Sequence, residues 1–257
     1  MNNVSFALKL TSFIRFSLGF LIIIVSALVY MPLMLLMIPF RGIRIRMGNL
    51  YGKVAGPAAI YTIGMRPKIL NRERIPNHYP AIYISNHSCA LDPLIAIWLC
   101  PIGGCGVAKK EISYVPFFGQ VYWLAGHILL DRSNKESAIA SLNEAAKWVA
   151  KYNLSLWVWP EGTRSKDGRL LPFKKGFVHM AIATGLPIVP IVVHQAHKRW
   201  PARTYIINPG PFTIEVLPPV DTSSWTTESL EAHVEEIKTI YTNTLSEDQH
   251  PLVSAPE

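Results

Sequence analysis

Residues 81–100 read AIYISNHSCALDPLIAIWLC, which is an apolar run, a polar turn and a second apolar run. The first run, Ala81–Ser85, follows Pro80 and predicts a short strand. Asp92-Pro93 then predicts a helix start, because Asp is favoured at the N-cap and Pro at the first helical position. A strand that passes through a polar turn into a helix is typical of an α/β fold.

The same arrangement recurs further along the chain. Leu154–Trp159 predicts a strand that ends in the polar turn Pro160–Ser165. The later predicted elements are a helix at Gly176–Thr184, strands at Ile188–Val193 and Thr213–Leu217, and an amphipathic helix marked by Leu230, Val234, Ile237 and Tyr241. We therefore predict an α/β domain with a mostly parallel sheet flanked by helices. Ligands of such sheets bind beyond the carboxyl ends of the strands, so both polar turns are candidate sites.

His87 and Asp92 are the candidate catalytic pair in the first turn. On one continuous helix, residues five apart point about 140° away from each other, but across a loop into a helix start they can meet. Asp92 would then accept a hydrogen bond from one imidazole nitrogen and leave the other nitrogen as a base. From spacing alone, the alternative stays open that Asp92 only caps the helix beside an ordinary loop histidine.

The second turn combines a carboxylate, a glycine, a hydroxyl and a guanidinium in Glu161, Gly162, Thr163 and Arg164. Such a group can hold a phosphate or orient a polar headgroup, although a solvated surface turn has the same composition. Further cations lie at the ends of apolar segments in Lys109-Lys110-Glu111, Gly126–Arg132 and Phe173–Gly176.

Charge is distributed unevenly along the 257 residues, which carry 25 Lys and Arg, 17 Asp and Glu, and a net charge of +8. Residues 1–72 contain nine basic side chains and no acidic one, so the remainder is nearly neutral. Half of the residues are hydrophobic and 16% are charged, which excludes a disordered chain. Three cysteines without C-x-x-C spacing favour a reduced cytosolic setting over a disulfide scaffold. Basic residues that flank an apolar run indicate an anionic membrane surface rather than nucleic acid.

That apolar run, Phe16–Phe40, is free of formal charge and as a helix would reach about 37 Å, enough to cross a bilayer core of about 30 Å. Pro32 and Pro39 interrupt it, and residues 47–65 form a milder Gly/Ala-rich stretch. The chain therefore divides into a basic, apolar membrane anchor of one or two helices at 1–72 and an α/β domain at 73–257. Whether the anchor spans the membrane or lies in its interface stays open, and in both cases the arginines at 41, 44 and 46 are expected at the headgroups.

Together these motifs resemble the 1-acylglycerol-3-phosphate acyltransferases, the lysophosphatidic acid branch of the glycerolipid acyltransferases. The resemblance runs from about Pro80 to Val193 and comprises four blocks in the order of the family. They are the N-H-x4-D block at Asn86, His87 and Asp92, the block from Gly126 to Asp131-Arg132, the E-G-T-R block at Glu161–Arg164, and the proline-containing strand at Val189–Val192. Lys109-Lys110-Glu111, followed by residues 115–119, is also similar to the family. His127 departs from the usual pattern.

The resemblance implies a glycerolipid acyltransferase-like fold and transfer of an acyl chain to the sn-2 hydroxyl of 1-acyl-sn-glycerol-3-phosphate, giving phosphatidic acid for phospholipid biosynthesis. His87 would be the general base, oriented by Asp92, with direct attack and no acyl-enzyme. Arg132, Lys109 and the turn of Arg164 would hold the acceptor phosphate, while Glu161, Gly162 and Thr163 would shape its pocket. The acyl donor, coenzyme A or acyl carrier protein, is a substrate, and no cofactor or metal is expected. His194 and His197 lack a carboxylate at ligand spacing.

Alternatives within and outside the family remain. The acceptor could be another lysolipid, for example one that contains an amino acid. Cys89 or Ser88 beside His87 would suit a thioester or lipid hydrolase, although no G-x-S-x-G elbow occurs. A non-catalytic lipid-binding module would not need these residues together. The expected location is the cytoplasmic face of a bacterial-type inner or plasma membrane, with the oligomeric state open.

Overall fold

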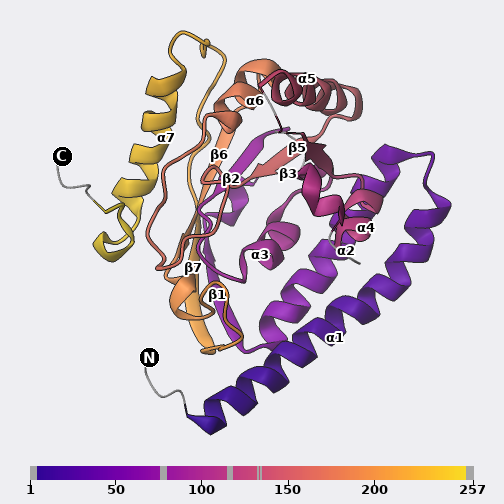
Figure 1. The fold of residues 1–257 in the computed structure, drawn as a ribbon, viewed down its shortest axis with the longest axis vertical. Coiled ribbons are helices and arrows are strands. Elements are labelled where there is room, and N and C mark those ends of the chain that lie inside the picture. The colour runs from indigo at the N-terminus through magenta and orange to yellow at the C-terminus, as the bar shows by residue number, and fades with distance from the viewer. Residues whose placement is uncertain (1–4, 76–79, 115–117, 132, 134, 253–257) are drawn as a thin grey trace.

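A mixed sheet forms the centre of the computed structural model, which describes residues 5–75, 80–114, 118–131, 133 and 135–252 (Figure 1). Its strands are β1 (Met65–Leu70), β2 (Ile82–Ser85), β3 (Gly104–Lys109), β4 (Ile128–Leu130), β5 (Ser155–Val158), β6 (Ile188–His194) and β7 (Gly210–Val216). The spatial order is β1-β7-β6-β2-β5-β3-β4, and every neighbouring pair is parallel except β6 and β7. The predicted mostly parallel sheet is confirmed.

The central strands are buried on both faces, which explains their continuous apolar sequences. In β2, Ile82 and Ile84 belong to one core cluster, while Tyr83 points to the opposite face and stacks on Trp157 of β5. This alternation follows from the two-residue period of a strand. The apolar runs at the sheet centre therefore predicted β2, β5 and β6 correctly.

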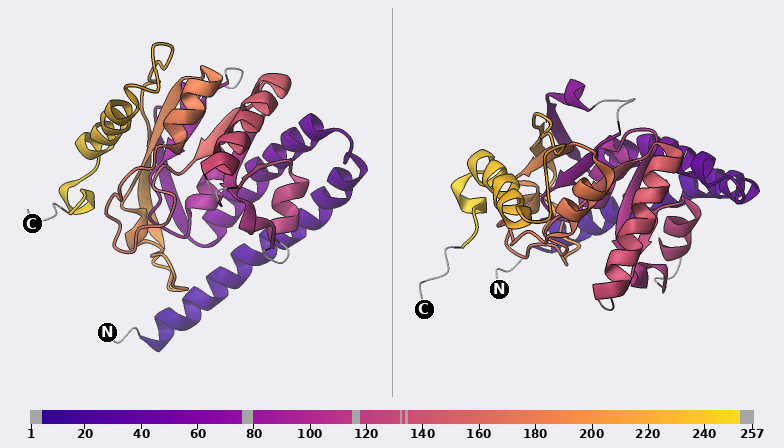
Figure 2. Two further views of the ribbon diagram at one scale, coloured as in Figure 1. Left: turned by 45° about the horizontal axis from the view of Figure 1, so that its top comes forward. Right: turned by 90° about the horizontal axis from the view of Figure 1, so that it is seen from above.

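Helices cover both faces of the sheet (Figure 2). One core cluster joins a sheet face to α2 (Arg41–Thr62) and α3 (Asp92–Leu99); the other joins the opposite face to α5 (Lys135–Tyr152), α6 (Gly176–Thr184) and α7 (Leu230–Thr244). The remaining α-helices are α4 (Phe118–Leu124) and the long α1 (Phe6–Leu36). Packing between α2 and α3 is close, since a Cβ on Gly52 would lie 2.4 Å from the Ile97 carbonyl oxygen.

Helix α1 contacts the rest of the protein along most of its length. Near its start, the backbone N–H of Ile207 donates to Oγ of Ser12 (3.0 Å), and near its end Met34 packs on Leu124 and Ala125. Ser12 and Met34 are separated by about 33 Å along a helix. The helix is long and apolar enough to cross a membrane, yet little of it is buried in the protein. Its contacts at both ends make α1 lie along the body instead of projecting from it.

The turn between α1 and α2 lies where the sequence predicted an interruption. Pro32 is accommodated inside α1, whereas Pro39 falls in the turn that follows the helix. Helix α2 then begins at Arg41, earlier than the stretch 47–65 suggested. Because Pro39 precedes Phe40, the N-cap of α2, its missing N–H removes no hydrogen bond from either helix.

Two arginines of the basic cluster bind backbone carbonyl oxygens. Arg44 is only 7% exposed and donates to the Leu124 carbonyl oxygen (2.7 Å), and Arg41 donates to that of Gly126 (3.1 Å). Only Arg46 is exposed. Backbone carbonyls around α4 bind the guanidinium of Arg44, and the expectation that the three arginines lie at the headgroups stays a prediction.

Strand β1 lies on the N-terminal side of the expected division at residue 72, yet it pairs with β7 from Met65 to Leu70. The sheet therefore extends into the segment that the sequence assigned to the anchor. Arg66, Pro67 and Lys68 interrupt its apolar pattern, which is tolerated because edge strands accommodate charges and proline.

Candidate active site

The two polar turns meet because β2 and β5 are parallel neighbours that end at the same edge of the sheet. The backbone N–H of Ser165 donates to the His87 carbonyl oxygen (2.8 Å). In the other direction, the His87 N–H donates to Oε1 of Glu161 (2.5 Å). Residues that are 74 positions apart in the sequence thus form one site.

His87 and Asp92 are in direct contact. Nδ1 of His87 lies 2.6 Å from Oδ2 of Asp92, and their side chains are 12% and 1% exposed. Asp92 is the first residue of α3 and not its N-cap; its Oδ2 accepts from the backbone N–H groups of Ser88 (2.8 Å) and Cys89 (3.0 Å). An ionised carboxylate only accepts hydrogen bonds, so the imidazole proton lies on Nδ1 and Nε2 carries the free lone pair.

Trp159 packs against one face of the His87 ring. The rings of His87 and Trp159 stack at 4.5 Å between centroids with an interplanar angle of 18°. Trp159 was not among the site residues predicted from the sequence. Tyr83 pairs with Trp157 in the register of β2 and β5, and Trp159 lies two residues beyond Trp157 on the same face. Its contact with His87 therefore depends on how the two strands pair.

Glu161 joins the two turns from the inside. Its Oε1 accepts from His87 and its Oε2 from the N–H of Leu171 (2.9 Å). Burial raises the pKa of Glu161 to about 8, while the two backbone donors act in the opposite direction. This carboxyl group therefore fixes the backbone of the catalytic turn in addition to lining the neighbouring cavity.

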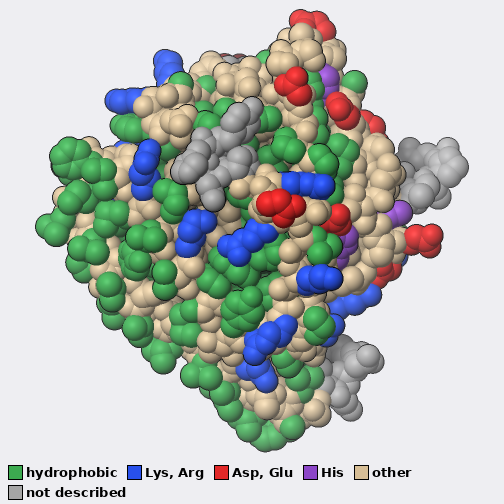
Figure 3. Space-filling view, turned by 180° about the vertical axis from the view of Figure 1, so that it is seen from behind, with side chains coloured by type: hydrophobic (Ala, Val, Ile, Leu, Met, Phe, Trp, Pro, Cys, Tyr) green, Lys and Arg blue, Asp and Glu red, His purple; other side chains and the backbone are tan. Residues whose placement is uncertain are grey.

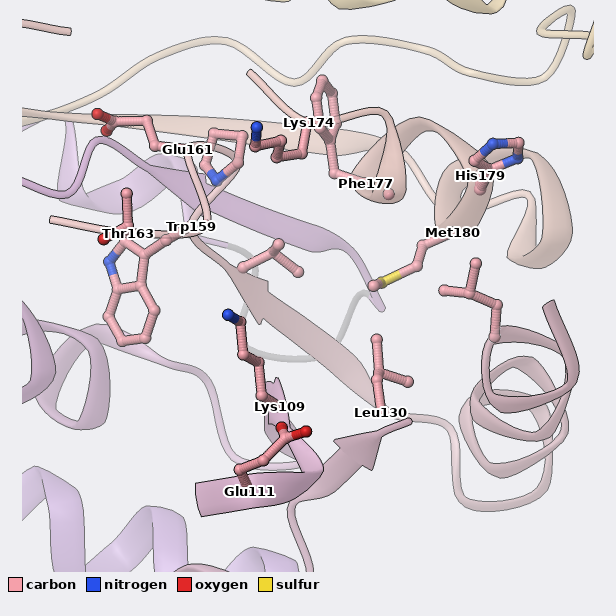
Figure 4. A pocket seen from close by; sticks show the side chains of 15 residues that line it. Lys109, Glu111, Leu130, Trp159, Glu161, Thr163, Lys174, Phe177, His179 and Met180 are labelled. Carbon is pink, nitrogen blue, oxygen red and sulfur yellow. The ribbon is translucent and has the colours of Figure 1, made fainter. Parts of the chain in front are cut away.

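A cavity of about 880 Å³ opens beside this site (Figure 4). One part is apolar and is lined by Leu130, Leu142, Val158, Phe177 and Met180. The other part is polar and is lined by Lys109, Glu111, Glu161, Gly162, Thr163 and Lys174. The cavity therefore combines an apolar part with a polar end that holds two lysines, and Trp159 lines it next to His87.

Lys109 and Lys174 approach the cavity from different elements (Figure 4). Lys109 is the last residue of β3, and the backbone N–H of Lys174 donates to the Pro160 carbonyl oxygen (2.7 Å). The sequence analysis noted the cations of residues 173–176 but did not assign Lys174 to the site. Its proximity depends on the tertiary contact with the turn after β5, which no sequence spacing reveals.

Arg132 and Arg164, the other two predicted cations, are not among the described residues that line the cavity. Arg132 lies outside the described residues, although Asp131 before it forms an ion pair with Lys110 (3.1 Å). Arg164 is exposed and does not line the cavity, unlike Gly162 and Thr163 of the same turn. The described cations at the cavity are Lys109 and Lys174.

Cys89 and Ser88 are both buried, and neither is placed as an attacking group. The Cys89 thiol donates to Oδ1 of Asp92, and burial raises its pKa well above the usual range. A thiol held in its neutral form is a poor nucleophile. Cys89 thus supports the position of Asp92, which removes the main feature that favoured a hydrolase.

Among the described residues, no group of three or more His, Cys, Asp and Glu side chains is arranged to hold a metal ion. The buried His87–Asp92 pair, beside a cavity with an apolar part and two lysines, suits general-base chemistry on a lipid substrate. The arrangement is a candidate acyltransferase site on an α/β fold.

Comparisons with known proteins agree. A family model described as Acyltransferase matches residues 66–194, half of the chain. The chain is 45% identical to a 1-acyl-sn-glycerol-3-phosphate acyltransferase of Limnanthes douglasii over 91% of this chain and 83% of that protein. It is 34% identical to the Escherichia coli K12 protein of the same name, over 69% and 70%.

A solved structure of the LPA acyltransferase PlsC from Thermotoga maritima has the same fold, with a TM-score of 0.69 at 22% identity over 92% of this chain and 97% of that one. The chain belongs to the 1-acyl-sn-glycerol-3-phosphate acyltransferase family and is an acyltransferase enzyme. The family and the fold that the sequence motifs predicted are confirmed.

Proposed function

We propose that this enzyme transfers an acyl chain from an acyl thioester to the sn-2 hydroxyl of 1-acyl-sn-glycerol-3-phosphate and so makes phosphatidic acid. The observation that carries the proposal is the His87–Asp92 pair beside a cavity with an apolar part and a polar end that holds two lysines. The names of the related acyltransferases support the acceptor.

His87 acts as the general base in this proposal. Its Nε2 takes the proton of the acceptor hydroxyl as that oxygen attacks the thioester carbonyl carbon. The tetrahedral intermediate then collapses, the carbon–sulfur bond breaks, and the imidazolium returns the proton to the leaving thiolate. Asp92 stabilises the imidazolium between the two steps, and no acyl-enzyme forms.

The polar end of the cavity receives the acceptor phosphate. Lys109 and Lys174 supply positive charge there, and Gly162 and Thr163 shape the wall beside them. The sequence motifs add Arg132 and Arg164 to this set. The apolar part of the cavity takes an acyl chain, because chain methylenes gain about 0.8 kcal/mol each when they leave water.

The acyl donor is coenzyme A or acyl carrier protein. Both present a thioester on an acidic carrier, and the two lysines of the polar end suit either of them. The amino-acid-containing lysolipids remain the alternative acceptors. A purified-enzyme assay that crosses both donors with a panel of lysolipids identifies the pair that reacts fastest.

The enzyme works at a membrane, and we place it at the cytoplasmic face, where the acyl donors are made. Helix α1 lies in the plane of the interface, since its contacts at Ser12 and Met34 hold it along the body. In this position the lysolipid enters the cavity without being extracted into water. The arrangement favours an interfacial anchor over a spanning one.

The decisive experiment is His87→Ala in the purified enzyme, with His233→Ala on α7 as the control. We expect a loss of at least about 100-fold in acyl transfer, the lower end of general-base assistance. Circular dichroism checks that the variant is folded. A folded His87→Ala enzyme with undiminished transfer would rule out the base assignment, and rapid release of free fatty acid without acceptor would favour hydrolysis.

A further inference from the structure

A second hollow, of about 250 Å³, lies between α2, α4 and α5. It shares no lining residue with the active-site cavity. The residues that decide its chemistry are Arg41, Arg44, Trp123, His127, Glu144 and Trp148. The proposed catalytic steps use none of them.

The hollow has an excess of positive charge. Arg41 stacks on Trp148 at 4.2 Å and directs Nε and Nη2 at the Gly126 carbonyl oxygen. Arg44 binds the Leu124 carbonyl oxygen. In the part of the chain that the structure describes, neither guanidinium forms an ion pair with a carboxylate. Burial, followed by the charge of Arg41, lowers the pKa of Arg44, so its charged form is disfavoured here.

Arg44 also has an unused donor. It is more than nine-tenths buried, and its Nε has no hydrogen-bond partner among the described residues. A buried polar group without a partner costs about 1–3 kcal/mol, and more when it is charged. An anion in the hollow would lie beside both guanidinium groups and offset their positive charge.

The other titratable groups leave the charge excess in place. Burial, followed by the charge of Arg41, lowers the pKa of His127 to about 4, so its ring is neutral at pH 7. Its Nδ1 accepts from the Gly106 N–H (3.0 Å). Glu144 is the carboxylate that lines the hollow, and it accepts from Nε1 of Trp148 (3.2 Å). Two cations therefore face one carboxylate.

The surroundings indicate where the anion comes from. Trp123, which lines the hollow, is exposed, and Phe40 and Ile43, which flank Arg41 in the sequence, also have exposed apolar side chains. In the space-filling view from behind, hydrophobic side chains gather along the side of the molecule that carries α1 and α2, with Lys and Arg side chains among them (Figure 3). Tryptophan and arginine beside an apolar surface are typical of the membrane–water interface, where lipid phosphates lie.

We propose that the hollow formed by Arg41, Arg44 and Trp148 binds the phosphate group of an anionic phospholipid, at a site separate from the active site. The guanidinium groups of Arg41 and Arg44 supply the positive charge that attracts the phosphate oxygens, and Arg41 keeps a donor that its carbonyl contacts do not use. The bound lipid fixes the α1–α2 turn at the bilayer surface. This proposal holds whichever lysolipid and acyl donor the enzyme uses.

The test is a fluorescence titration of the full-length enzyme in neutral detergent, because Trp123 and Trp148 report occupancy of the hollow. The probe is dihexanoyl phosphatidylglycerol below its micelle concentration. Arg41→Gln should weaken binding about tenfold, the change expected for one charge-assisted hydrogen bond. Arg46→Gln is the matched control, because Arg46 is an exposed arginine on the same helix, and it should leave binding unchanged.

A variant that is expected to bind the probe more tightly excludes misfolding as the explanation, because a misfolded protein would not gain affinity. Glu144→Gln removes the carboxylate from the hollow at an exposed position of α5, so it should tighten binding of the same probe. Equal weakening by Arg41→Gln and Arg46→Gln would overturn the proposal in favour of general surface charge. An unchanged affinity in Glu144→Gln would also count against it.

Two further arms separate the alternatives. In the first arm, inorganic phosphate replaces the lipid. If it binds the wild type as tightly as the lipid does and binds Arg41→Gln more weakly, the ligand is free phosphate and the lipid proposal is overturned. Lys109→Gln should bind the lipid like the wild type. Loss of binding in Lys109→Gln but not in Arg41→Gln would assign the probe to the active-site cavity and overturn the second site, whatever the outcome of the catalytic assays.

Discussion

Nδ1 of His87 lies 2.6 Å from Oδ2 of Asp92, and the same oxygen accepts from two backbone N–H groups of the intervening turn. The carboxylate is therefore held by the residues that separate it from the histidine. Its orientation is set before any substrate arrives. A preorganised acceptor of this kind fixes both the tautomer and the direction of the imidazole ring.

Asp92→Asn should lower kcat by about 10²–10⁴-fold with little change in KM, the range for loss of general-base assistance. An asparagine can donate as well as accept, so it permits the histidine tautomer that carries its proton on Nε2. In that tautomer Nε2 cannot take the proton of the acceptor hydroxyl. Steady-state kinetics measure the change. Asp221→Asn, at an exposed position, is the control and should behave as the wild type. A wild-type kcat in Asp92→Asn would contradict the orienting role.

Trp159→Ala should lower kcat about tenfold, because an aromatic contact of about 0.5–1.5 kcal/mol restrains the His87 ring. Trp159→Phe keeps a ring in the stack and should recover most of the activity. Thermal unfolding of both variants distinguishes loss of ring positioning from simple destabilisation. If Phe and Ala are equally impaired while both variants remain folded, stacking is not the function of this residue.

The sequence predicted the centre of the sheet and missed its edges. Apolar runs without interruption identified β2, β5 and β6, because strands buried on both faces need no polar residues. Strands β1, β3 and β4 were missed: β1 carries Arg66, Pro67 and Lys68, β3 is rich in glycine, and β4 has three residues. Such strands are stabilised by their neighbours and have little pattern of their own.

The candidate site was predictable to the extent that its residues sit in short motifs. His87 and Asp92 lie in one turn, and their contact follows from the loop between them. Trp159 and Lys174 depend on how β2, β5 and the turn before α6 are assembled. The burial of Arg44 was not predictable for the same reason, since a charge count does not show which backbone carbonyls accept from its guanidinium.

Glu161 should make the stability of the protein depend on pH. Its pKa is about 8 in the folded protein against an ordinary value of 4.5, so the folded state binds the proton more tightly. The stabilisation is fully present below pH 4.5 and is lost as pH rises through about 8. Urea unfolding in detergent should show stability falling by up to about 1.4 kcal/mol per pH unit between these values.

Glu161→Gln should flatten this pH dependence, because glutamine does not titrate. It should also lower stability at pH 5, since its amide group cannot accept from both the His87 and Leu171 N–H groups. Glu235→Gln on the exposed face of α7 is the matched control and should retain the wild-type slope. An unchanged slope in Glu161→Gln would assign the pH dependence to another group.

The outer face of α1 should determine membrane binding. Leu28 is 67% exposed on α1, and Leu252 is 72% exposed near the C-terminal end of the described chain. Burying a leucine in the bilayer contributes about 1.5–3 kcal/mol, so Leu28→Asp should weaken partitioning onto vesicles by at least about tenfold, whereas Leu252→Asp should not change it. Vesicle sedimentation measures both. Because Leu28 faces away from the body, Leu28→Asp should keep its activity on detergent-dispersed acceptor. Equal partitioning of the two variants would show that another surface holds the enzyme on the membrane.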